Sequence, residues 1–78
     1  MEKDKFLNDF QSQFVDSDEI TVDGSTEFRK IGSWDSLTGM AVLVMIKDEY
    51  GVDMAETDLK KCNTVQDIFQ FVSLKSSK

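Results

Sequence analysis

Histidine and proline are absent from the 78 residues, and cysteine occurs once. The lack of histidine removes the side chain best suited to proton transfer near neutral pH, and no Cys/His cluster is available to hold a metal ion. Because Cys62 has no second cysteine to pair with, we expect a reducing, cytoplasmic setting and a buried, unreactive thiol. No paired carboxylates or glycine-rich phosphate loop replace these groups, so the sequence indicates a protein that catalyses no reaction itself.

Basic residues are also few, since 9 lysines and arginines stand against 15 acidic residues and leave a formal net charge of −6. This balance disfavours nucleic acid and anionic membranes as partners and favours a basic protein surface. The N-terminus is charged and lacks an apolar segment, so we expect a soluble protein with no membrane insertion. A chain this short predicts one domain over residues 1–78, monomeric, with a disordered tail at residues 75–78.

Apolar residues recur at helical spacing in four stretches, which predicts an all-α fold. The expected architecture is a small four-helix bundle with a long loop between helices 1 and 2 and a short third helix. The predicted helices cover residues 2–15, where phenylalanine recurs at every fourth position, then 36–50, 56–61 and 65–74. Gly51 is expected to end the second helix, and Thr64 with Asp67 forms a capping pattern before the fourth.

Residues 16–34 show no long helical period, and two interpretations compete. Asp23-Gly24 could form the turn of a β-hairpin, but a lone hairpin is marginal without a sheet to join. We favour a long loop pinned by apolar side chains, with one helical turn near residues 26–31. An EF-hand frame fits Asp16, Asp18 and Glu27. It fails at Ile20, which occupies a ligand position, and at Thr21, where the calcium loop requires glycine, so no specific metal site is predicted.

The stretch Asp35-Ser36-Leu37 opens the second helix, with Asp35 as the preferred N-cap. Ser36 alone could be a capping residue or a modification site, because a helix start attracts phosphate. The apolar run that follows divides into two stripes at 100° per residue. One stripe suits the core, and a small domain will struggle to cover the second, which suggests a docking face, although a helix buried all round is the alternative. The second stripe consists of Leu37, Met40, Ala41 and Val44.

These residues resemble the acyl carrier protein family. The matching pattern is Phe28, Ile31 and Gly32, then Asp35-Ser36-Leu37, the apolar helix ending Glu49-Tyr50, and Thr64-Val65-Gln66-Asp67-Ile68. In that family the serine of Asp-Ser-Leu carries 4′-phosphopantetheine, taken from coenzyme A by a phosphopantetheinyl transferase. The resemblance therefore implies that Ser36 is the attachment site, flanked by Asp35 and Leu37, and that the chain presents acyl groups as thioesters to other enzymes.

The resemblance implies partners of two kinds, the transferase and acyl-transferring or condensing enzymes with basic and apolar docking patches. We expect Leu37, Met40, Ala41 and Val44 to supply apolar contact, and Asp35 and Asp48 to attract the basic patch. Fatty-acid-synthesis carriers usually have acidic residues on the exposed side of this helix, where this chain has Thr38, Gly39, Ala41 and Lys47. The pathway could thus be fatty acid, polyketide or specialised acyl transfer; an unmodified helical adaptor and a peptidyl carrier are the alternatives.

Overall fold

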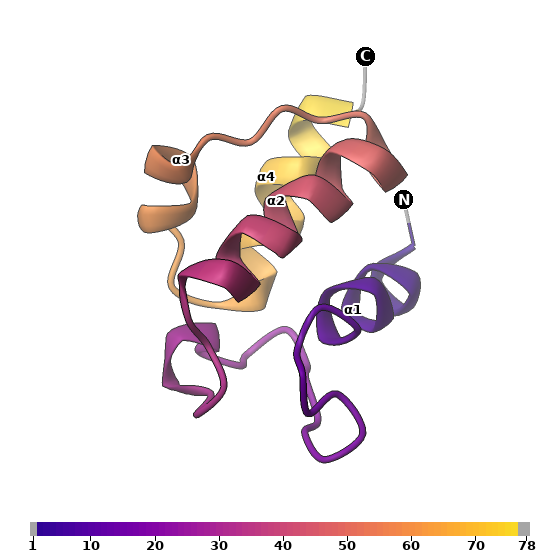
Figure 1. Cartoon of the computed structure of the whole chain (residues 1–78). Helices are drawn as coiled ribbons and strands as arrows, with labels where there is room; N and C mark the ends of the chain where they lie inside the picture. Colours follow the sequence, from indigo (N-terminus) through magenta and orange to yellow (C-terminus); the bar gives the residue numbers. More distant parts are fainter. Residues whose placement is uncertain (1, 77–78) are drawn as a thin grey trace.

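The computed structural model describes residues 2–76 and contains no strand among them. It has four α-helices, α1 (Lys3–Gln11), α2 (Ser36–Tyr50), α3 (Glu56–Lys60) and α4 (Val65–Ser76), with a 3₁₀ turn, η1 (Phe28–Lys30), in the long loop after α1. In Figure 1, α2 crosses in front of α4, α1 lies on one side of this pair, and the short α3 lies on the other. The prediction of a small all-α bundle with a short third helix is confirmed.

The hydrophobic core lies where α1, α2 and α4 pack together. Phenylalanine rings from α1 fill much of it: the ring of Phe6 lies 5.5 Å from that of Phe69 and 6.4 Å from that of Phe10. The long loop contributes a further ring, because Phe28 of η1 packs edge-on against Phe10 at 6.1 Å. The largest fully buried side chains are Phe6, Phe10, Phe28, Ile46, Ile68, Val42, Val65 and Val72.

The first helix is shorter than predicted, because α1 ends at Gln11 and not at residue 15. After Gln11 the backbone tightens: the N–H of Phe14 donates to the carbonyl of Gln11, three residues back. The side-chain amide of Gln11 donates to the carbonyls of Ser17 and Ile20, both at 2.8 Å, and so draws the following loop across the helix end. Phe14 is buried although it lies outside the helix. The phenylalanine spacing therefore predicted the burial of Phe14 correctly and the length of the helix incorrectly.

The long loop is pinned as predicted and contains no hairpin. Val22 and Phe28 are buried, and Phe28 begins η1, within the stretch where one helical turn was expected. The loop bonds to α4: the carbonyl of Thr26 accepts from the N–H of Val65 at 3.0 Å, and that of Gly24 accepts from the N–H of Gln66 at 2.9 Å. Since the first N–H groups of a helix have no partner within it, this contact satisfies two of them.

The ends of α2 and α4 follow the predicted capping. Gly51 adopts a left-handed φ of 68° directly after α2, a conformation that glycine tolerates best. Before α4, the hydroxyl of Thr64 accepts from the N–H of Asp67 at 3.3 Å, and the Asp67 carboxylate accepts from the N–H of Thr64 at 3.0 Å. The helix continues to Ser76, so the expectation of disorder is wrong for residues 75–76, while residues 77–78 lie outside the described residues.

A polar cluster ties α1 to the end of α2. The Nζ of Lys5 donates to the carboxylate of Asp9 at 2.8 Å and to that of Glu49 at 3.2 Å. The hydroxyl of Tyr50 donates to the same oxygen of Asp9 at 2.8 Å. The bond from Lys5 holds the pKa of Asp9 below its usual value, whereas burial and the bond to Asp9 raise the pKa of Tyr50 to about 12. Asp9 is therefore held as a carboxylate that fixes both neighbours.

Candidate functional site

Ser36 is the first residue of α2, and its side chain is exposed. The N-cap role belongs to Asp35, whose Oδ1 accepts from the backbone N–H of Thr38 at 2.8 Å. This bond from the backbone of Thr38 lowers the pKa of the Asp35 carboxyl, which is therefore ionised at neutral pH. Because Asp35 caps the helix, the Oγ of Ser36 is left without a hydrogen-bond partner among the residues the structure describes.

Three kinds of contact hold the turn that precedes Ser36 in place. The hydroxyl of Ser33 donates to the carboxylate of Asp16 at 2.6 Å, which ties the turn to the long loop. The Trp34 ring packs at 4.9 Å from the ring of Phe28 and at 6.0 Å from that of Phe14, so it supports the loop. The backbone N–H of Trp34 donates to the carbonyl of Ile31 at 3.0 Å. These contacts fix the start of α2 relative to the long loop.

Gly39 of α2 faces this ring, at a separation that would leave a side-chain Cβ in ordinary van der Waals contact. A Cβ added to Gly39 would lie 3.4 Å from Cζ2 of Trp34 and 3.8 Å from a methyl carbon of Leu59. Thr38 and Gly39 are both buried, which corrects the expectation that they form part of the exposed side of the helix. For Gly39 the reason is tertiary, because Trp34 and Leu59 of α3 lie over it, and the periodicity of α2 alone gives no sign of this. Thr38 lies against the preceding turn, where its hydroxyl donates to the carbonyl of Ser33 at 3.5 Å.

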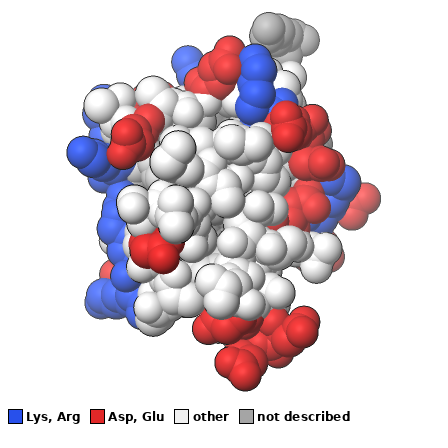
Figure 2. All heavy atoms as spheres, in the orientation of Figure 1, with Lys and Arg blue, Asp and Glu red and all other residues white. Residues whose placement is uncertain are grey.

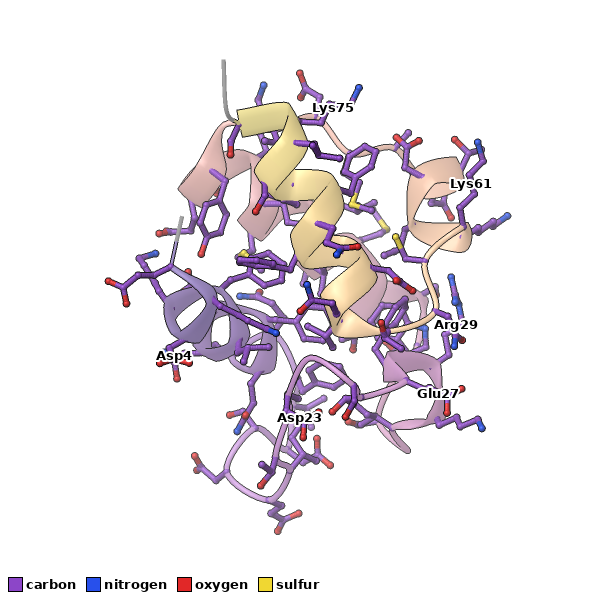
Figure 3. All side chains as sticks on the ribbon, turned by 180° about the vertical axis from the view of Figure 1, so that it is seen from behind. Asp4, Asp23, Glu27, Arg29, Lys61 and Lys75 are labelled. Atoms are coloured by element: carbon purple, nitrogen blue, oxygen red, sulfur yellow. The ribbon has the colours of Figure 1, made fainter. Side chains whose placement is uncertain are left out.

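A groove of about 150 Å³ opens beside Ser36, between the start of α2 and α3. Arg29 fixes its far wall, because its guanidinium donates to the carbonyl of Leu59 at 2.7 Å and to that of Cys62 at 2.5 Å. Figure 3 shows Arg29 rising from η1 toward the turn that carries Lys61. The groove is lined by Arg29, Trp34, Asp35, Ser36, Glu56, Leu59 and Lys60.

The second stripe of α2 is exposed, as the sequence predicted. Leu37, Met40 and Val44 are 76%, 61% and 57% exposed, and Ala41 is half-buried. Figure 2 shows an uncharged surface over α2, bordered by basic and some acidic side chains along the edge where α3 and η1 lie and mainly by acidic ones on the opposite side. Asp48 is exposed and shares a groove of about 370 Å³ with Ala41 and Val44, between α2 and the residues that follow α1. A helix buried all round is thereby excluded.

Cys62 does not contribute a reactive group. Its side chain is buried, and burial raises the pKa of the thiol, so the thiolate that would act as a nucleophile is disfavoured. The residues that the structure describes contain no group of three or more histidine, cysteine or acidic side chains placed to hold a metal ion. Over the same residues, no helix combines the length and the apolar character that crossing a membrane requires.

Three residues that support the site gave no signal in the sequence. Arg29 is one arginine in an irregular loop, and only the fold brings it to the carbonyls at the end of α3. Asp16 fits a calcium-ligand position in the sequence, whereas in the structure its carboxylate accepts a hydrogen bond from the hydroxyl of Ser33, 17 residues away. Gly39 looks in the sequence like a residue that only lowers helix propensity, and only the fold shows that Trp34 lies against it.

A comparison with protein families matches residues 11–72 to the family described as phosphopantetheine attachment site. The matched range runs from the end of α1 into α4 and so includes the capped start of α2, the groove and the exposed stripe. Neither the curated proteins nor the solved structures that were searched give a match.

Proposed function

Because the chain belongs to the phosphopantetheine attachment family, whose domains carry the group covalently and are non-catalytic, we propose that it is an acyl carrier protein modified at Ser36. The observation that supports this site is the division of roles at the start of α2. Asp35 supplies the cap, and the hydroxyl of Ser36 is exposed and unbonded within the described part of the chain. The side-chain oxygen of a capping serine would accept a hydrogen bond from a backbone N–H, and that of Ser36 accepts none within the described part of the chain.

The surroundings of Ser36 fit a phosphodiester. The hydroxyl lies at the positive end of the dipole of a 15-residue helix, which favours a phosphate there. In the attachment step, catalysed by the transferase, Ser36 Oγ bonds to the phosphorus of the phosphopantetheine moiety of coenzyme A. The pyrophosphate bond breaks, adenosine 3′,5′-bisphosphate leaves, and the serine proton passes to the transferase. When bound, the group supplies a thiol that holds acyl groups as thioesters.

The exposed stripe of α2 is the proposed docking face for the transferase and for acyl-transferring or condensing enzymes. Leu37, Met40 and Val44 offer apolar contact beside Ser36, with Ala41 at the edge. Asp35 and Asp48 lie at either end of this stripe and suit a basic patch on the partner. The pathway we propose is fatty acid, polyketide or specialised acyl transfer in a reducing, cytoplasmic compartment, with the carrier acting as a monomer.

Intact-mass measurement tests the proposal. The chain is incubated with coenzyme A and a phosphopantetheinyl transferase of broad specificity, and its mass should rise by one phosphopantetheinyl group. Ser36→Ala should abolish the rise while leaving the fold intact, because Asp35 still caps α2 and alanine is a good helix former. Ser12→Ala, at an exposed serine on α1's end, is the control and should load normally. An unchanged mass, or loading mapped to another serine, would refute the assignment.

A further inference from the structure

Two lysines on α3 and directly after it, Lys60 and Lys61, differ from the other basic residues that the structure describes. Both are exposed, and neither side chain makes an ion pair, a hydrogen bond or a ring contact among the described residues. The other described cations are engaged: Lys5, Lys30 and Lys47 in ion pairs, Lys3 and Lys75 over phenylalanine rings, and Arg29 with backbone carbonyls. In a chain of net charge −6, two unpartnered cations beside each other are available for an external anion.

Only the first of these lysines lines the groove beside Ser36. Lys60 and Ser36 share this space of about 150 Å³, with Trp34 and Leu59 as its apolar walls. Ligand pockets usually measure about 300–1,000 Å³, so the groove is too small for a long acyl chain and suits a few atoms next to Ser36. Two acidic residues, Asp35 and Glu56, also line it and oppose an anion. The other basic residue of its lining, Arg29, is bound to the carbonyls of Leu59 and Cys62. Lys60 is the cation that remains free to bind.

We propose that Lys60 binds the phosphodiester formed at Ser36, and that Trp34 and Leu59 pack against the first apolar atoms of the attached arm. This inference rests on the proposed attachment at Ser36. The arm then leaves Ser36 over α3, on the side of α2 where Gly39 faces Trp34. The exposed stripe of Leu37, Met40 and Val44 lies on another side of the helix, so it stays uncovered for docking while the arm is held.

The test compares two charge reversals on neighbouring residues. Lys60→Glu removes the proposed contact and Lys61→Glu makes the same change in net charge outside the groove. Both lysines are exposed, so both variants should keep the circular dichroism of the parent. Intact mass first establishes that each protein is loaded with phosphopantetheine from coenzyme A. Trp34 is the only tryptophan, so its fluorescence reports on the groove without interference.

In the loaded parent and in Lys61→Glu, we expect nuclear Overhauser effects between the pantoyl methyl groups and the indole of Trp34, with reduced quenching of Trp34 by acrylamide. In Lys60→Glu the population of this contact should fall by about two- to fivefold, as is typical of an exposed ion pair. The inference is overturned if the loaded parent shows no such effects, or if both variants behave alike. Failure of loading itself would instead overturn the proposed attachment and, with it, this contact.

Discussion

The two methionines Met40 and Met45 provide a matched test of how α2 divides its surface. Both lie within the same helix, yet Met40 is 61% exposed and Met45 is 6% exposed. The same substitution, methionine to alanine, can be made at each position without introducing a charge or a poor helix former. Any difference between the two variants must therefore come from what covers the side chain.

The expected magnitudes follow from burial. Truncation of a buried methionine to alanine costs about 2–5 kcal/mol, because apolar contact is lost and a cavity is left. At Met40 only about two fifths of the side chain is covered, so the loss is at most about 1 kcal/mol, and the higher helix propensity of alanine offsets a few tenths of it. A domain of 78 residues has a total stability of about 4–12 kcal/mol, so Met45→Ala removes a large share of it.

Urea unfolding followed by the circular dichroism of the helices measures both variants. With a slope of about 1 kcal/mol per molar urea for a domain of this size, the midpoint should fall by about 2 M or more for Met45→Ala and by less than about 1 M for Met40→Ala. The rate of loading by the transferase should show the reverse order. Measured without urea, at a temperature where both variants are folded, Met40→Ala should load more slowly than Met45→Ala. Equal midpoints, or a larger loss at Met40, would show that the exposed stripe belongs to the core.

Two further predictions concern the C-terminal end of α2, where Tyr50 binds Asp9 of α1 and where Gly51 ends the helix. Because the folded-state pKa of Asp9 is lowered, chiefly by Lys5, its contribution to stability is present above the ordinary carboxyl pKa and is lost as the pH falls through the lower, folded value. Acid titration of unfolding should thus show a steeper loss below about pH 4 in the parent than in Asp9→Asn, and parallel profiles would contradict the role of the cluster. Gly51→Ala should destabilise by about 1 kcal/mol because of its positive φ, whereas Gly32→Ala, with similar open space but no positive φ, should be neutral or slightly stabilising in the same thermal-unfolding measurement.

The parts of the fold that could be predicted are those encoded by neighbouring residues. Asp35 as N-cap, Gly51 as helix stop and the reciprocal caps of Thr64 and Asp67 each depend on groups within four residues, so their sequence is sufficient evidence. The exposed stripe of α2 was predictable for a related reason. Helical geometry fixes which residues share a side, and the small size of the domain limits how many sides can be covered.

The parts that could not be predicted depend on contacts between distant segments. α1 stops at Gln11 because its side chain binds loop carbonyls 6 and 9 residues further on, while the phenylalanine spacing continues to Phe14. Gly39 is buried because Trp34 and Leu59 of α3 lie over it, and Arg29 reaches residues 30 and 33 positions away. The groove beside Ser36 is made of such contacts, so the sequence could indicate the serine and could not describe its surroundings.

The net negative charge and the proposed cation at Lys60 do not conflict. At physiological ionic strength, interactions between exposed charges are screened beyond about 8 Å, so Asp48 and Lys60 each act mainly on groups that lie close to them, and the acidic excess of the chain adds a salt-dependent attraction of a basic partner. A phosphodiester at Ser36 would lie beside the same small groove as Lys60, close enough for this one side chain to bind it. Attraction of a basic partner and retention of the arm can therefore be changed separately: a charge reversal at Asp48 should alter the salt dependence of docking, while one at Lys60 should alter the position of the arm.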